Sequence, residues 1–155
     1  MSVEEDYKKT PKELYDSLPK RTQTWVDNKV SKIKVTFALW FIFTVVAVSA
    51  VIIFVIRNPF EEPLGLWLQR SGSIISLLAV IAEVVFVAKL NKLVRISHWA
   101  KLTCEVYLDI KYKPLLNISI FITIVLVILG TLIWGYGDIL YEQINASSEA
   151  SKIST

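Results

Sequence analysis

Three long runs that carry almost no charge constrain this chain more than any other feature of its sequence. Residues 35–56 and 114–137 contain no Asp, Glu, Lys or Arg, and residues 71–88 contain a single charged side chain, Glu83. A helix needs about 20 apolar residues to cross the roughly 30 Å hydrocarbon core of a bilayer. The runs also lack the apolar–polar alternation of a barrel strand. They therefore predict an all-α integral membrane protein with three transmembrane helices.

The distribution of positive charge predicts how these helices are oriented. Of the 17 Lys and Arg residues, eight lie in residues 1–34, two in 57–70, six in 89–113 and one in 138–155. Three crossings place the first and third of these segments on one side of the membrane. The positive-inside rule assigns the side that is richer in Lys and Arg to the cytoplasm. We therefore expect a cytoplasmic N-terminus and an outer C-terminus.

The same boundaries divide the chain into seven segments. They are a cytoplasmic N-terminal segment (1–34), transmembrane helix 1 (35–56), an outer loop (57–70), transmembrane helix 2 (71–88), a cytoplasmic basic amphipathic segment (89–113), transmembrane helix 3 (114–137) and an outer tail (138–155). In the first segment, Thr10 and Glu13 flank Pro11 in the pattern of a capping box, which predicts a helix that stops before Pro19. From Thr22 onward the sequence permits a second helix that continues into the first transmembrane run.

Residues 89–113 leave two interpretations open. Lys92, Arg95 and Lys101 lie off an apolar stripe with three- and four-residue spacing. The stripe consists of Leu93, Ile96, Ala100, Thr103, Tyr107 and Ile110. The segment is either a basic amphipathic helix on the cytoplasmic leaflet, or a continuation of the second transmembrane helix that turns back before Pro114. Its basic residues favour anionic headgroups in both cases, so the bilayer, with anionic lipids at its cytoplasmic face, is an expected partner.

Glu83 is the first candidate functional residue, because a carboxylate inside a membrane is costly. Four- and three-residue steps place Gly72, Ser76 and Ala79 on the face of the helix that carries Glu83. Polar residues expected at comparable depth are Asn117, Ser119 and Thr123 on the third helix, with Trp40 and Thr44 on the first. The carboxyl either faces a pore or cavity or holds the helices together by hydrogen bonding. We favour the second reading, since a proton relay usually involves several ionisable groups.

The third run ends in Gly135-Tyr136-Gly137-Asp138. These residues match part of a potassium-channel selectivity filter, whose backbone carbonyls replace the hydration shell of the ion. That filter follows a short re-entrant helix and precedes another span, whereas this tetrapeptide closes a full-length run. We therefore interpret it as a helix stop, because glycine suits the C-terminal positions of a helix.

The longer string Gly130-Thr131-Leu132-Ile133-Trp134-Gly135-Tyr136-Gly137-Asp138 resembles the closing segment of small bacterial multi-span membrane proteins. The resemblance covers nine residues and implies a bacterial inner-membrane protein without assigning it an activity. In physical terms, Thr131 and Gly135 form a small-xxx-small pair. Together with Gly130, they predict a seam for helix packing on the third helix.

The sequence offers no recognised catalytic or metal-binding pattern. Cys104 is the single cysteine, and its distance of six residues from His98 matches no metal-ligand spacing. The segments outside the three runs are too short to form a catalytic domain. We therefore expect no enzyme activity, no cofactor, no metal and no nucleic-acid partner.

Two classes of function remain. Three helices cannot enclose a conduit alone, so the first class is a helical homo-oligomer, either pore-like or membrane-perturbing, such as an effector of bacterial defence or lysis. In this interpretation the face from Gly72 to Glu83 lines or seals the pore. The alternative is a membrane-embedded accessory, interaction or immunity subunit that pairs with another membrane protein. Both classes use small-residue faces, so packing motifs do not separate them.

Overall fold

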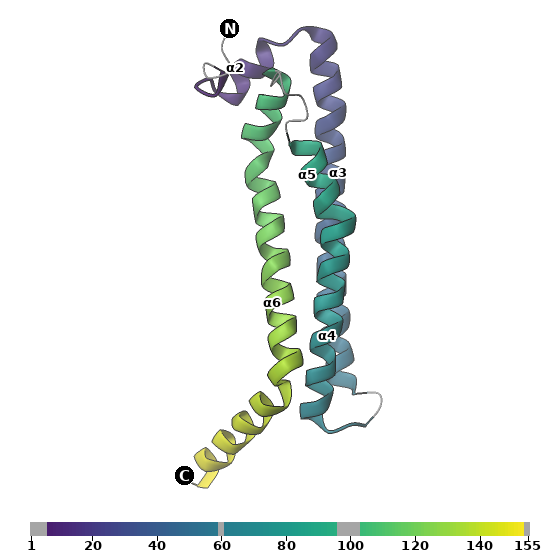
Figure 1. Cartoon of the computed structure of the whole chain (residues 1–155), viewed down its shortest axis with the longest axis vertical. Helices are drawn as coiled ribbons and strands as arrows, with labels where there is room; N and C mark the ends of the chain where they lie inside the picture. The colour runs from purple at the N-terminus through teal and green to yellow at the C-terminus, as the bar shows by residue number, and fades with distance from the viewer. Residues whose placement is uncertain (1–5, 59–60, 96–102, 154–155) are drawn as a thin grey trace. The chain divides into compact units, whose positions relative to one another are not determined.

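The computed structural model describes residues 6–58, 61–95 and 103–153, and within them every regular element is a helix (Figure 1). The elements are α2 (Pro11–Asp16), α3 (Lys20–Arg57), α4 (Leu64–Ala82), the π-helical segment η1 (Glu83–Val87), α5 (Ala88–Val94) and α6 (Thr103–Ile153). Among the described residues, three helical stretches are long and apolar enough to cross a membrane: Lys20–Arg57, Leu64–Val94 and Thr103–Gln143. This confirms the predicted fold class of an all-α, multi-pass membrane protein.

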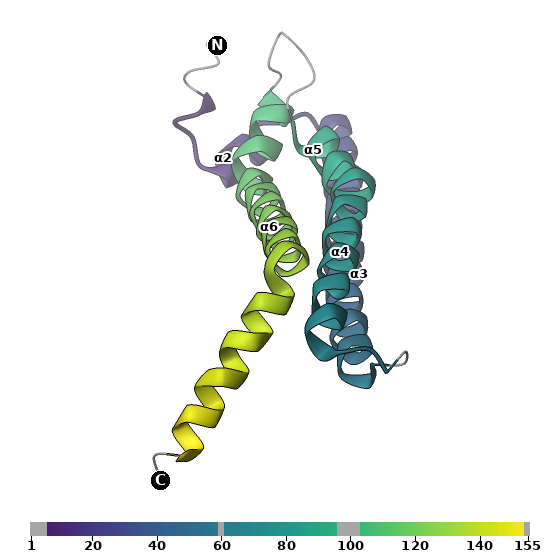
Figure 2. The same cartoon turned by 60° about the horizontal axis from the view of Figure 1, so that its bottom comes forward.

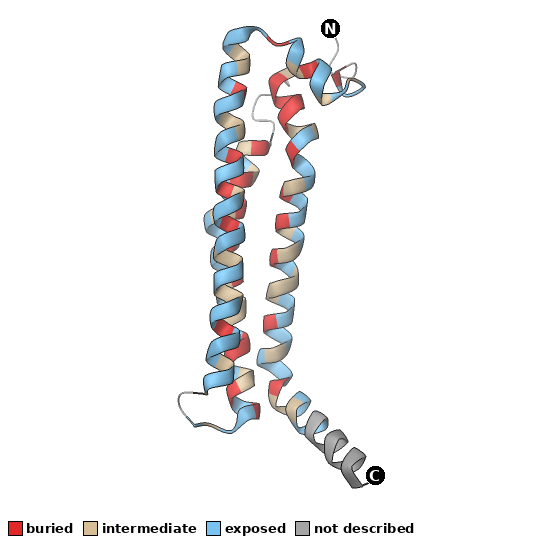
Figure 3. Cartoon of the chain, turned by 180° about the vertical axis from the view of Figure 1, so that it is seen from behind, coloured by how far each residue is buried: buried red, intermediate tan, exposed pale blue. Residues whose placement is uncertain are grey.

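The three long helical stretches bury only a minority of their side chains, as Figure 3 shows. Only 11% of the most apolar stretch of α3 is buried, and the corresponding share is 22% for each of the other two helical stretches. A soluble protein rarely exposes such a continuous apolar surface. Lipid hydrocarbon is the solvent in which this surface carries no penalty.

The chain forms two compact units, which are described separately. Unit 1 consists of Met1–Ile42 and Glu83–Phe121, and unit 2 consists of Phe43–Ala82 and Ile122–Thr155. Each unit therefore takes one portion of α3 and one portion of α6. Unit 2 contains the whole of α4, whereas η1 and α5 belong to unit 1.

The start of α2 in unit 1 follows the predicted capping box. The Thr10 hydroxyl accepts a hydrogen bond from the Glu13 backbone N–H at 3.3 Å, and the Glu13 carboxylate accepts one from the Thr10 N–H at 2.8 Å. Pro11 occupies the first turn, and the helix ends at Asp16, before Pro19. The hydrogen bond from the Thr10 backbone N–H is the main reason that the pKa of Glu13 is lowered. The predicted helix start and its end before Pro19 are both confirmed.

Unit 1 has a core to which α3, α5 and α6 contribute buried side chains. On α3, Val26, Ile33 and Trp40 are buried at seven-residue spacing, so they lie along one face of the helix. Leu90 and Val94 of α5 are also buried, as are Val106, Leu108, Tyr112 and Leu116 of α6. The parts of α3, α5 and α6 that belong to unit 1 therefore pack against protein.

The structure divides residues 89–113 between two helices, which differs from a separate helix on the leaflet. Residues 89–94 complete α5, which follows directly from α4 and η1 (Figure 2). Helix α6 begins at Thr103 and passes through Pro114. Because Tyr107 is buried in unit 1, this portion of the apolar stripe packs against protein. His98 and Trp99 lie outside the described residues.

The predicted helix stop at residues 135–138 is replaced by continuous helix. Helix α6 runs through these residues to Ile153, and no described glycine has a positive φ. A Cβ on Gly137 would lie 2.9 Å from the Cα of Gln69, so this glycine permits close packing in unit 2. Helix α4 likewise begins at Leu64, inside the predicted outer loop. Local sequence signals for helix ends are thus overridden by packing between helices.

Candidate functional site

Gly72 of α4 and Gly130 of α6 bring two helix backbones into contact within unit 2. A Cβ on Gly72 would lie 2.3 Å from the Trp134 backbone nitrogen and 2.5 Å from the Gly130 carbonyl oxygen. A Cβ on Gly130 would lie 2.8 Å from the Ser76 backbone nitrogen. No side chain fits at either position, which is the arrangement that small residues permit between membrane helices. The predicted packing residues Gly72, Ser76 and Gly130 therefore lie together.

Hydroxyl groups reinforce this contact between α4 and α6. The Ser76 and Thr131 hydroxyl oxygens lie 3.3 Å apart, and the Thr131 hydroxyl donates to the Val127 carbonyl at 2.7 Å. Gly135 has nothing within 4 Å of an added Cβ, so it takes no part in the contact. The structure therefore brings Thr131 to the helix interface and leaves Gly135 in open space. Sequence spacing alone did not distinguish the two.

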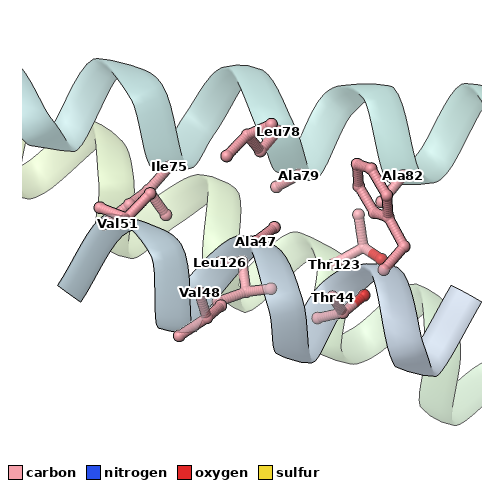
Figure 4. A pocket seen from close by; sticks show the side chains of 11 residues that line it. Thr44, Ala47, Val48, Val51, Ile75, Leu78, Ala79, Ala82, Thr123 and Leu126 are labelled. Atoms are coloured by element: carbon pink, nitrogen blue, oxygen red, sulfur yellow. The ribbon is translucent and has the colours of Figure 1, made fainter. Parts of the chain in front are cut away.

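A small cavity in unit 2 includes two further candidates, Ala79 and Thr123 (Figure 4). The lining is mostly apolar, with the hydroxyls of Thr44 and Thr123 at one end, and the cavity volume is about 20 Å³. Such a volume holds about one water molecule. This cavity is therefore a packing feature and provides no conduit within unit 2.

Glu83 lies in unit 1 at the start of η1, and its side chain is exposed. The adjacent Val84 and Val85 are also exposed. No described residue forms a hydrogen bond or an ion pair with the Glu83 carboxyl. Gly72 and Ala79 are buried, so the face expected from their spacing does not extend to Glu83. Glu83 is the first residue of η1, where the helix changes from 3.6 residues per turn to the wider π turn.

Asn117 is a second exposed polar residue of unit 1 at comparable sequence depth. It lies four residues beyond Lys113 on α6, and Glu83 lies six residues before Lys89. No hydrogen bond reaches the Asn117 amide from the part of the chain that the structure describes. Ser119, by contrast, is buried and donates to the Leu115 carbonyl at 3.0 Å. Glu83 and Asn117 are thus the candidate residues that unit 1 presents outward.

Unit 1 also contains a polar cleft that sequence reasoning missed. Its volume is about 610 Å³, and its polar lining includes Lys12, Lys34, Lys111, Tyr15 and Asp27. The Tyr15 hydroxyl donates to Asp27 at 2.9 Å, and this hydrogen bond is the main reason that the pKa of Tyr15 is raised. A capping box predicts α2 but not the helices against which it packs, so the convergence of these residues could not be read from spacing.

Cys104 is buried, and the described residues contain no group of three or more His, Cys, Asp or Glu side chains arranged to hold a metal ion. Comparisons of the chain with protein-family models, with curated proteins and with solved structures find no match. The resemblance of residues 130–138 to small bacterial membrane proteins therefore stays a prediction.

Proposed function

We propose that this protein is a membrane-embedded subunit that self-associates laterally through Glu83 and Asn117. The observation that supports it is the exposure of a carboxyl and an amide at comparable depth in unit 1, neither of them hydrogen-bonded to a described residue. Hydrocarbon offers no hydrogen-bonding partner to such groups, so their exposure is costly. Contact with another protein helix removes that cost.

A second copy of this chain is the occupant that fits these two residues. An amide supplies both a donor and an acceptor, so Asn117 of one copy can pair with the Glu83 carboxyl of another in either protonation state. In a ring of copies, each copy would pair its Glu83 with Asn117 of one neighbour and its Asn117 with Glu83 of the other. The three charge-poor runs contain no Lys or Arg, so the chain carries no cation at this depth to neutralise Glu83.

Assembly is also what a pore-like or membrane-perturbing effector requires, because three helices alone enclose no conduit. Ser76 and Gly72 contact α6 of the same chain. We therefore place any lumen of an oligomer at the face that carries Glu83. In the orientation that the positive charges favour, unit 1 lies towards the cytoplasm. The accessory or immunity subunit remains the alternative, with a helix of another protein in the place of the second copy.

The mass of the detergent-solubilised protein, expressed alone and measured by light scattering with detergent correction, tests self-association. We expect a discrete oligomer of several copies for the native chain and for Glu83→Gln, which keeps hydrogen-bonding capacity. An interhelical hydrogen bond in a membrane contributes roughly 0.6 to 2 kcal/mol. Glu83→Leu and Asn117→Leu should each weaken the association roughly 3- to 30-fold per contact.

Ser49→Leu is the matched control, because Ser49 is an exposed polar residue of α3 in unit 2. It should leave the oligomer unchanged. A monomeric native chain would overturn self-association, and equal losses in Ser49→Leu and Glu83→Leu would remove the role of Glu83.

Conductance across a planar bilayer then distinguishes an oligomer that forms a pore from one that acts as a scaffold. A pore predicts that Glu83→Gln changes conductance while the oligomer persists, whereas a scaffold predicts no conductance in any variant.

A further inference from the structure

The polar cleft of unit 1 gathers positive charge from three helices. Lys12 comes from α2, Lys34 from α3 and Lys111 from α6, and Asp27 is the one acidic residue in the lining. The ion pairs found among the described residues join Lys9 to Asp6, Arg70 to Glu62 and Lys113 to Asp109. None of them involves a lysine of the cleft. The three ammonium groups therefore have no anionic partner in the described chain.

Hydrogen bonds in the cleft hold its groups in an arrangement that suits an anion. The Lys111 ammonium donates to the Tyr107 hydroxyl at 2.7 Å and lies 5.1 Å from the centroid of that ring. One phenol takes one of the three ammonium protons, so the other two remain for a ligand. The Asp27 carboxylate accepts from the Tyr15 hydroxyl with both of its oxygens at 2.9 Å. The donor to Asp27 is thus an uncharged phenol and not a lysine, so the three ammonium groups remain available to attract an anion.

The cleft lies where the charged parts of α3 and α6 meet the apolar runs of these two helices. Lys34 is the last charged residue before the run 35–56, and Lys111 lies three residues before the run 114–137. Seven residues further along each helix, two turns and about 10 Å deeper, the same faces carry Phe41 and Ile118. These side chains are 55% and 52% exposed. Each helix therefore presents an ammonium group above an exposed apolar side chain, both within unit 1.

We propose that this cleft binds the phosphate of an anionic phospholipid between Lys12, Lys34 and Lys111, with the acyl chains along Phe41 and Ile118. A free phosphate or a nucleotide shares the anionic chemistry of the headgroup. Neither has acyl chains that could lie along the apolar residues below the lysines. Those apolar residues therefore favour the lipid. Lysines at a membrane surface strengthen binding to anionic lipid, in line with this assignment. The inference does not depend on self-association through Glu83.

Chemical labelling of the native chain tests the site without any substitution. The full-length protein in nanodiscs is acetylated with a lysine-directed reagent, and modification of each lysine is measured by peptide mass spectrometry. We expect Lys34 and Lys111 to be protected in phosphatidylcholine discs that contain phosphatidylglycerol, and to react in discs of phosphatidylcholine alone. Inorganic phosphate added to the latter should not protect them. Protection by inorganic phosphate equal to that by phosphatidylglycerol would assign the cleft to a soluble ligand and overturn the proposal.

Substitution of the lysines gives the second measurement. Native mass spectrometry of the detergent-purified chain, with phosphatidylglycerol added, should show retained lipid for the native protein. Retention should fall about fivefold for each of Lys34→Gln and Lys111→Gln. The matched control is the pair Lys32→Gln and Lys113→Gln, exposed lysines of the same two helices that do not line the cleft. Equal losses in the control pair would show general surface attraction and overturn a defined site, as would equal retention of phosphatidylcholine by the native chain.

Discussion

At the scale of single residues, glycines that look alike in the sequence have different roles in the structure. Gly72 and Gly130 allow α4 and α6 to touch, whereas Gly135 faces open space. The sequence predicted a packing seam on the third helix, and the contact at Gly130 and Thr131 agrees with it. The position of Gly135 could not be predicted, because a small-xxx-small pair does not specify which partner helix lies opposite each member.

Replacing Gly72 and Gly135 by alanine should therefore change stability in opposite directions. Gly72→Ala places a methyl group against the Trp134 backbone and should lower the free energy of unfolding by about 1–3 kcal/mol. In Gly135→Ala the added methyl group contacts no other atom. This substitution should raise the free energy of unfolding by up to about 1 kcal/mol, because alanine favours the helix. Unfolding of the micelle-bound protein, followed by circular dichroism, measures both. A loss of stability in Gly135→Ala as large as that in Gly72→Ala would contradict the contact.

Asp6 makes the stability of unit 1 dependent on pH. The Thr103 hydroxyl donates a hydrogen bond to the Asp6 carboxylate at 2.8 Å, and the Lys9 ammonium lies 3.1 Å from the same carboxylate. These two contacts hold the pKa of Asp6 below its ordinary value of 3.8, and the hydrogen bond from Thr103 has the larger effect. A carboxyl whose pKa is lowered in the folded state stabilises the fold above its ordinary pKa, and the contribution is lost as the pH falls through the lowered value.

The native chain should therefore be more stable than Asp6→Asn at neutral pH. The difference between their free energies of unfolding should shrink as the pH falls below 3.8, where the native carboxyl becomes protonated. Chemical unfolding at a series of pH values measures this difference. A difference that stays constant from neutral pH to strongly acid conditions would show that the charge of Asp6 has no part in the contact.

At the scale of helices, the sequence predicted which elements exist better than where they begin and end. The capping box at Thr10 and the three apolar runs depend on local chemistry, and both are found in the structure. The ends of α4 and α6 depend on neighbours that local patterns do not identify, such as Gln69 against Gly137. The π-helical turn Glu83–Val87 had no signal in the sequence.

The cap of α2 gives a prediction at this scale. Thr10→Ala removes the hydroxyl that accepts the Glu13 N–H and should destabilise α2 by about 1 kcal/mol. Amide exchange in residues 13–16 should then accelerate roughly fivefold, since exchange of a helix end reports its local opening. Thr24→Ala is the control, because the Thr24 hydroxyl bonds back to the Lys20 carbonyl inside α3 and caps no helix. Similar acceleration in the control would argue against the capping contribution.

At the scale of the whole molecule, the distribution of positive charge predicts the orientation of the chain in the membrane, which the arrangement of the helices alone does not indicate. The segments with 14 of the 17 positive charges are expected to lie in the cytoplasm. In a Cys104→Ala background, Lys8→Cys should react with a membrane-impermeant maleimide only after the membrane is opened. Gln143→Cys should react in intact cells. The reverse pattern would place the N-terminus outside, and with it the cleft of unit 1.

Self-association through the exposed face of η1 is the central claim, and photo-crosslinking from a position beside Glu83 tests it most directly. A benzophenone amino acid replaces Val84, which is 68% exposed, while Glu83 itself is kept; Val46 of α3 in unit 2, at 60%, serves as the control position. After irradiation in membranes, we expect an adduct with the mass of two chains from position 84 and much less from position 46. An adduct to a different protein would support the accessory subunit, and the absence of any protein adduct at position 84 would contradict assembly through this face.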